Sequence, residues 1–114
     1  MITYQDINNL IASIGVPYAY YQFPEGTGVA PPFICFYYDQ QIGFAADNTN
    51  FAKPEHLVIE LYTNNKDFQL EAQIEKALND IGLVYSRMES YIDSEKLFLQ
   101  TFESEVLING QQQS

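Results

Sequence analysis

Two segments of this chain combine an apolar stripe at helical spacing with a polar residue before the stripe and a glycine after it. In the first segment Thr3 precedes the stripe, Asp6 stands at the second position of a capping box, and Gly15 ends the pattern. In the second segment Asp67 precedes the stripe and Gly82 follows it. The stripes consist of Tyr4, Ile7, Leu10, Ile11 and Ile14 in the first segment and Leu70, Ile74, Ala77, Leu78 and Ile81 in the second. We therefore predict two amphipathic helices.

The other apolar runs are rich in β-branched and aromatic residues, which favours strands. We expect strands at 16–23, 33–39, 56–63, 84–92 and 97–108. The first two strands would pair as a hairpin across a loop rich in glycine and proline, and the last two would form a closing hairpin. The order α-β-β-β-α-β-β predicts an α+β fold, a two-layer sandwich with two helices on one face of a mostly antiparallel sheet.

The length and composition fit one compact unit. The chain has 114 residues, of which 46% are hydrophobic, and such a chain can bury a single core without metals or disulfides. We assign residues 1–110 to a single α+β domain and expect the polar tail 111–114 to be frayed. The first residues lack a basic segment followed by an apolar one, and no apolar run approaches the ~18 residues of a membrane span. We therefore expect a protein that is made and kept in the cytoplasm.

The charge of the chain argues against two classes of partner. Five Lys and Arg residues stand against fifteen Asp and Glu residues, which gives a net charge of −10. The basic residues are scattered singly, so no basic patch is available to neutralise several phosphates together. We expect neither sequence-specific nucleic acid binding nor binding to an anionic membrane.

Residues that could carry catalysis or bind a metal are scarce. The chain has one cysteine, Cys35, in an apolar run, and one histidine, His56, at the expected start of a strand. Zinc sites need several such ligands, and covalent catalysis needs a nucleophile beside a base. Glu103 and Glu105 would share one face of a strand and are expected to face solvent. The sequence predicts no enzyme activity, no cofactor and no metal, with Cys35 serving to pack.

One long connection is the best candidate for an interaction site. Residues 40–55 exceed the usual connection length of ~4–6 residues, and Asp47 and Asn48 are typical of a turn at its tip. Phe44 and Phe51 flank this tip, and apolar side chains on an exposed loop often mark a partner surface. The alternative is that the two rings fold onto the subunit's own core. The tyrosine-rich strand from residue 18 to 21 suits either a subunit contact or pairing within the sheet.

An ordered series of segments from residue 17 to residue 105 resembles a known family. The series is Tyr18-Ala19-Tyr20-Tyr21, Pro31-Pro32-Phe33-Ile34, Phe44-Ala45-Ala46-Asp47-Asn48, Ile59-Glu60-Leu61-Tyr62-Thr63 with Lys66-Asp67, and Ser90-Tyr91-Ile92-Asp93-Ser94-Glu95-Lys96. It is similar to the small tail-terminator (tail-completion, head–tail joining) proteins of long-tailed phages and prophages of Gram-positive bacteria. The resemblance lies in the order of the segments, since no single motif is specific.

The resemblance implies a structural protein of the virion neck. Such proteins are assembled in the host cytoplasm and form a homohexameric ring, which caps the tail tube, stops its polymerisation and docks the head. Its partners would be the major tail tube protein and the head-closure or connector protein, and DNA would pass through the ring. A lumen lined by six copies of so acidic a chain would repel DNA phosphates and let the genome slide.

Two other functions remain as alternatives. The first is another neck component, such as a head-closure (stopper) or minor capsid protein, since small neck proteins share these sequence features. An acidic inhibitor that mimics DNA is suggested only by the net charge of −10. Such a mimic requires carboxylates gathered on one polar face, whereas here they are spread along the chain beside a large apolar fraction.

The 40–55 connection yields a first prediction. Replacing Phe44 and Phe51 with Ser should leave a folded monomer of normal helix content but abolish rings or tube capping, as measured by circular dichroism and by analytical ultracentrifugation with tail tubes present. Unfolding of the double variant would instead assign both rings to the subunit's own core.

Overall fold

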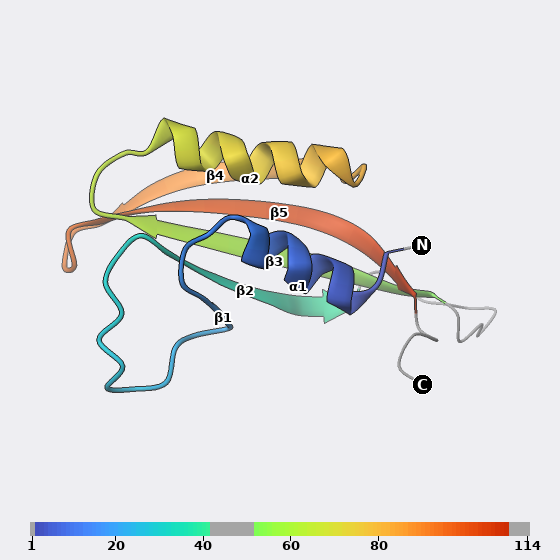
Figure 1. Cartoon of the computed structure of the whole chain (residues 1–114), viewed down its shortest axis with the longest axis horizontal. Helices are drawn as coiled ribbons and strands as arrows, with labels where there is room; N and C mark the ends of the chain where they lie inside the picture. Colours follow the sequence, from blue (N-terminus) through green and yellow to red (C-terminus); the bar gives the residue numbers. More distant parts are fainter. Residues whose placement is uncertain (1, 42–51, 110–114) are drawn as a thin grey trace.

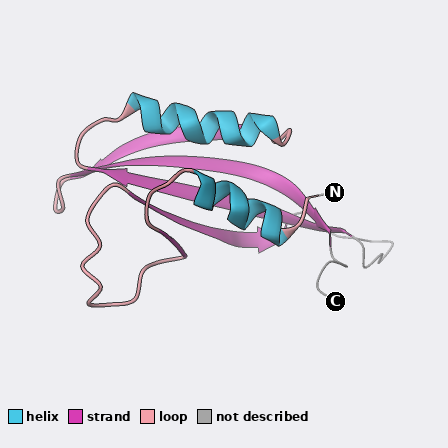
Figure 2. Ribbon diagram, in the orientation of Figure 1, coloured by secondary structure: helices cyan, strands magenta, loops and turns pink. Residues whose placement is uncertain are grey.

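In the computed structural model, which describes residues 2–41 and 52–109, two helices pack on a five-stranded sheet (Figure 1). The elements in chain order are α1 (Tyr4–Ser13), β1 (Tyr18–Tyr20), β2 (Phe33–Gln41), β3 (Ala52–Thr63), α2 (Phe68–Asp80), β4 (Tyr85–Ile92) and β5 (Leu97–Asn109). The strands lie in the order β1-β2-β3-β5-β4, and every pair except β1–β2 is antiparallel. The α+β class and the element order predicted from the sequence are confirmed (Figure 2).

Both helices begin at the predicted caps. The Thr3 hydroxyl accepts a hydrogen bond from the Asp6 backbone N–H, and the Asp6 carboxylate accepts one from the Thr3 N–H, each at 3.0 Å. Asp67 caps α2 with a single bond, because its carboxylate accepts a hydrogen bond from the Leu70 N–H at 3.0 Å. Gly82 follows α2 with a φ of 79°, a conformation that favours glycine. In the described part of the chain, neither helix has the length and apolarity needed to cross a bilayer.

A single apolar core lies between the helices and one face of the sheet. On β2, β3 and β5 alternate residues point to this face, and the helices contribute their stripes. The least exposed members are Ile7, Ile11, Ile34, Leu57, Ile59, Leu61, Ile74, Leu78, Phe102, Val106 and Ile108. Ile81 was expected in the stripe of α2, but it follows the last helical residue and is exposed.

The first two strands do not form the expected hairpin. β1 is only three residues long and runs parallel to β2, with Tyr18 opposite Ile34 and Tyr20 opposite Phe36. The chain leaves β1 at Tyr21, whose φ of 70° turns it away, and the connection 21–32 returns to the start of β2. Such a connection has about the dozen residues that a parallel crossover needs, whereas a hairpin needs only a tight turn.

The 40–55 connection is also shorter than the sequence suggested. β2 continues to Gln41 through an irregularity between Tyr38 and Gln40, and β3 already begins at Ala52. The sequence placed Pro54 in a loop, whereas it lies in β3, opposite Leu107 of β5.

The two ends of the described chain are joined at one end of the sheet. Ile2 forms an isolated parallel bridge with Ile108. The Asn109 N–H donates to the Ile2 carbonyl at 2.8 Å. The segment before α1 is therefore tied to the end of β5.

The burial of Leu78 predicts the effect of shortening its side chain. Leu78→Ala should lower the free energy of unfolding by about 2–5 kcal/mol, because Leu78 is fully buried and its removal leaves a cavity. Ile81→Ala is the matched control, and it should change stability by less than about 1 kcal/mol because Ile81 is exposed. Chemical denaturation followed by circular dichroism measures both. Equal effects of the two substitutions would contradict the placement of the core.

Candidate interaction surface

The face of the sheet opposite the helices, here called the open face, is covered at one end by the 21–32 connection. Tyr21 packs edge-on against Tyr37, with ring centroids 5.6 Å apart. Phe23 packs against Phe33 in the same way at 5.4 Å. Cys35 lies beneath this connection and is 5% exposed; burial, with a contribution from the charge of Glu60, raises the pKa of its thiol. The cysteine is therefore a packed, protonated side chain, as predicted.

Tyrosines hold the glutamates of β3 in place. The Tyr37 and Tyr62 hydroxyls donate to the two carboxylate oxygens of Glu60 at 2.9 and 2.8 Å. On the helix face the Tyr4 hydroxyl donates to Glu55 at 2.6 Å, and burial together with this bond raises the pKa of Tyr4 to about 12. These acidic groups thus have hydrogen-bond donors within the subunit.

His56 joins three strands across the open face. Its Nδ1 lies 2.6 Å from an Asp39 carboxylate oxygen and its Nε2 lies 3.0 Å from a Glu103 oxygen. Both nitrogens donate together only when the ring is protonated. Burial lowers the pKa of His56, but the hydrogen bonds and charges of Asp39 and Glu103 outweigh it and raise the pKa above 6.5. With both nitrogens occupied, the ring has none left to act as a base.

His56 was expected at the start of a strand, yet it lies well inside β3 because β3 begins at Ala52. Glu103 and Glu105 do share the open face, as the alternation of β5 predicted. Within residues 2–41 and 52–109, no group of three or more His, Cys, Asp or Glu side chains is arranged to hold a metal ion.

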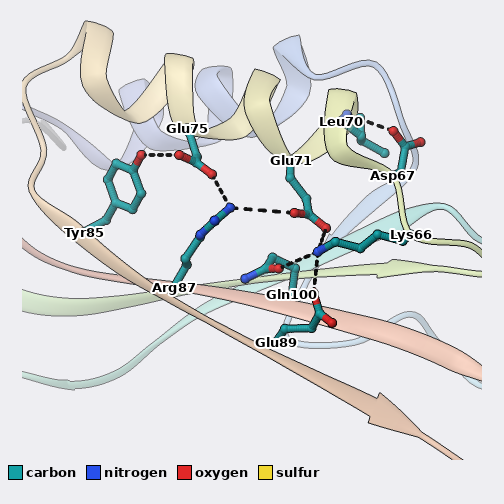
Figure 3. A network of polar contacts seen from close by, with 9 residues as sticks. All are labelled: Lys66, Asp67, Leu70, Glu71, Glu75, Tyr85, Arg87, Glu89 and Gln100. Atoms are coloured by element: carbon teal, nitrogen blue, oxygen red, sulfur yellow. Dashed lines mark hydrogen bonds and ion pairs between the residues drawn. The ribbon is translucent and has the colours of Figure 1, made fainter.

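A second polar cluster lies between α2, β4 and β5 (Figure 3). The ammonium of Lys66 donates to Glu71 at 2.7 Å, to Gln100 at 3.3 Å, and to Glu89. Burial lowers the pKa of Lys66, but the hydrogen bonds and charges of the two glutamates outweigh it and raise the pKa above 10.5. The carboxylate of Glu71, with a side chain only 3% exposed, is thereby compensated inside the fold.

Arg87 extends this cluster along β4. Its guanidinium donates to Glu75 at 2.7 Å and lies 3.8 Å from the other oxygen of Glu71 (Figure 3). The Tyr85 hydroxyl donates to the remaining oxygen of Glu75 at 2.8 Å. The charged side chains of β4, Arg87 and Glu89, therefore bind partners within the subunit. The sequence signal for this cluster is the pair Glu71 and Glu75, which lie four residues apart in α2 beside its apolar stripe.

The exposed apolar side chains gather at the two edges of the sheet. Among the described residues, nine large apolar or aromatic side chains are exposed, and six of them lie in or beside β1 and β4. At the β1 edge these are Tyr18, Tyr20 and Tyr21, and at the β4 edge they are Val84, Met88 and Tyr91. Such apolar exposure at the surface favours contacts with a partner.

The four interface residues expected from sequence, Phe44, Asp47, Asn48 and Phe51, lie outside the described residues. Their role remains a prediction. At the tyrosines of 18–21 the structure shows pairing within the sheet, since Tyr20 packs on Phe36 with ring centroids 5.4 Å apart. Tyr20 is also 54% exposed, and a subunit contact there stays a prediction. The sequence analysis did not identify the β4 edge, although Met88 stands between Arg87 and Glu89 in an expected strand.

Comparisons with known proteins give a structural likeness. No family model matches the chain, and no curated protein matches its sequence. Among solved structures, a chain of the "Virion of native gene transfer agent (GTA) particle" is similar, with a TM-score of 0.58 and 18% sequence identity. The match covers 91% of this chain and 90% of that one. At this identity the likeness shows a shared fold along nearly the whole of both chains.

The histidine bridge predicts a pH dependence. A group whose pKa is raised on folding stabilises the fold fully below its unfolded pKa, and this contribution disappears as the pH rises through the folded value. The stabilisation by His56 should therefore be complete below about pH 6.5 and fade above it. As the only histidine, His56 gives a single set of ring signals in proton NMR. Their midpoint should lie above 6.5 and fall in Asp39→Asn; an unchanged midpoint would contradict the bridge.

Proposed function

We propose that this chain is a structural protein of a phage-like virion at the head–tail interface, and specifically a tail terminator. In this role it forms a homohexameric ring that caps the tail tube, stops its polymerisation and docks the head. The observation that carries the proposal is the match to a chain of a gene transfer agent virion across nine tenths of both chains. The ordered resemblance to tail terminators supports the finer assignment.

The chemistry of the described surface supports an assembly role. The polar groups that most resemble a reactive site are engaged within the subunit, since His56 binds two carboxylates and Glu60 accepts from two tyrosines. Six of the nine exposed large apolar side chains of the described residues lie instead at two separate edges of the sheet. A closed ring needs two such different surfaces on each subunit, because each contact joins one surface to the other.

In the proposed assembly, the major tail tube protein lies on one side of the ring and the head-closure or connector protein on the other. DNA passes through the lumen without sequence-specific contacts. The net charge of −10 per chain suits a lumen along which phosphates slide. We assign Phe44 and Phe51 to the contact with a neighbouring subunit or the tube.

The proposal is tested on tubes polymerised from the major tail tube protein of the same phage-like element. Adding this chain should shorten the tubes and place a ring at one end, as measured by negative-stain electron microscopy. The matched control is Gln73→Glu, which adds one charge on the exposed outer side of α2 and should cap normally. Unchanged tube lengths would contradict a terminator, and binding to the head connector alone would favour the head-closure alternative.

A further inference from the structure

The two edges of the sheet carry no net charge, although the chain as a whole is strongly acidic. Residues 16–24, which contain the β1 edge, include no charged side chain. The β4 edge, residues 84–92, contains only Arg87 and Glu89, whose charges cancel. Both side chains are also engaged, Arg87 with Glu75 and Glu89 with Lys66.

The lack of net charge at both edges indicates which kind of partner fits them. Copies of a chain with a net charge of −10 repel one another, so a contact between copies is least costly where charge is absent. A basic partner would be drawn instead to the carboxylates elsewhere on the surface. Neutral edges that also carry exposed tyrosine, methionine and valine side chains fit a second copy of this chain.

The β4 edge lacks the usual protection against pairing. β4 pairs with β5 without interruption from Tyr85 to Ile92, and it contains neither proline nor bulge. Its side chains from Ser86 to Tyr91 are all exposed, and its only basic residue, Arg87, is bound to α2. Proline, bulges and free charges protect an edge strand from pairing, and β4 has no proline or bulge and its two charged side chains are engaged within the subunit. It is therefore suited to add a further strand.

The β1 edge provides a different surface on the far side of the same sheet. β1 is the opposite end of the strand order, and its three residues are followed by the exposed Tyr21. We propose that the β4 edge of one copy docks against the β1 edge of the next, so that the sheet continues from subunit to subunit. This inference rests on the proposed ring and names the contact that closes it.

The side chains on the open face make the contact testable. Tyr21 packs on Tyr37 of the open face, and Met88 lies opposite Thr101 on that same face. In a continued sheet whose helices stay on one side, Tyr21 of one copy and Met88 of the next therefore share a face. Both are surface side chains, 61% and 62% exposed.

The test is a charge pair built across the contact. Met88→Lys and Tyr21→Asp should each raise the concentration needed for assembly at least about tenfold, because each buries an unpaired charge. Aspartate suits position 21 because it tolerates the positive φ found there. The double variant should regain assembly, since the ammonium introduced on β4 of one copy then meets the carboxylate introduced beside β1 of the next.

Sedimentation velocity measures assembly, and circular dichroism with thermal melting verifies that each variant is folded. Gln73→Lys, on the exposed side of α2, is the control and should assemble like the parent chain. Hydrogen exchange supplies a second measure: the amides of 18–21 and 84–92 should exchange more slowly in the assembled protein than in the folded single variants.

Three results would overturn the inference. Folded single variants that assemble like the parent chain would place the contact elsewhere. Loss of assembly in Met88→Lys alone, with no effect of Tyr21→Asp, would indicate that two β4 edges pair with each other. A double variant that stays monomeric would exclude the alternating contact. In each case the parent chain still forms its oligomer and caps tubes, so the failure is separate from a failure of the proposed function.

Discussion

The pairing of β3 with β5 is the constraint on which the rest of this fold depends. These two long strands are paired from Ala52 opposite Asn109 to Thr63 opposite Phe98. Because side chains alternate along each strand, this one register decides which residues lie under the helices and which face outward. A shift by one residue would bury Glu60 and expose Ile59, and the core would be lost.

The parts of the fold that could be predicted from sequence are those governed by neighbouring residues. Thr3, Asp6 and Asp67 cap helices because side chain and backbone lie within one helical turn, and the β4–β5 hairpin follows from two runs with a turn between them. The parallel pairing of β1 could not be predicted, because it depends on where the 21–32 connection packs. The early start of β3 was missed because it depends on the distant end of β5.

The candidate surface also has features that the sequence predicts and features that depend on residues far apart in the chain. The alternation of β5 placed Glu103 and Glu105 on one face, and the tyrosines at 18–21 are a candidate contact surface from their sequence alone. The bridge of His56 could not be predicted, because Asp39 and Glu103 come from two other strands. The engagement of Arg87 with Glu75 and of Glu89 with Lys66 likewise could not be predicted, because tertiary packing brings these partners to β4. Partners far apart in sequence are the part that a single sequence does not reveal.

Because Ile2 is bridged to Ile108, the two ends of the described chain lie side by side, and the packing of the core does not require the chain to begin and end there. Residues 2 and 109 are joined by a backbone hydrogen bond, so a short linker could connect them at little entropic cost. New ends could then be opened in the turn 93–96, which is exposed and outside the core. A circular permutant of this kind would keep the same sheet and would move both termini to the other end of the molecule (Figure 1). A reporter fused there would lie far from the linker between Ile2 and Asn109.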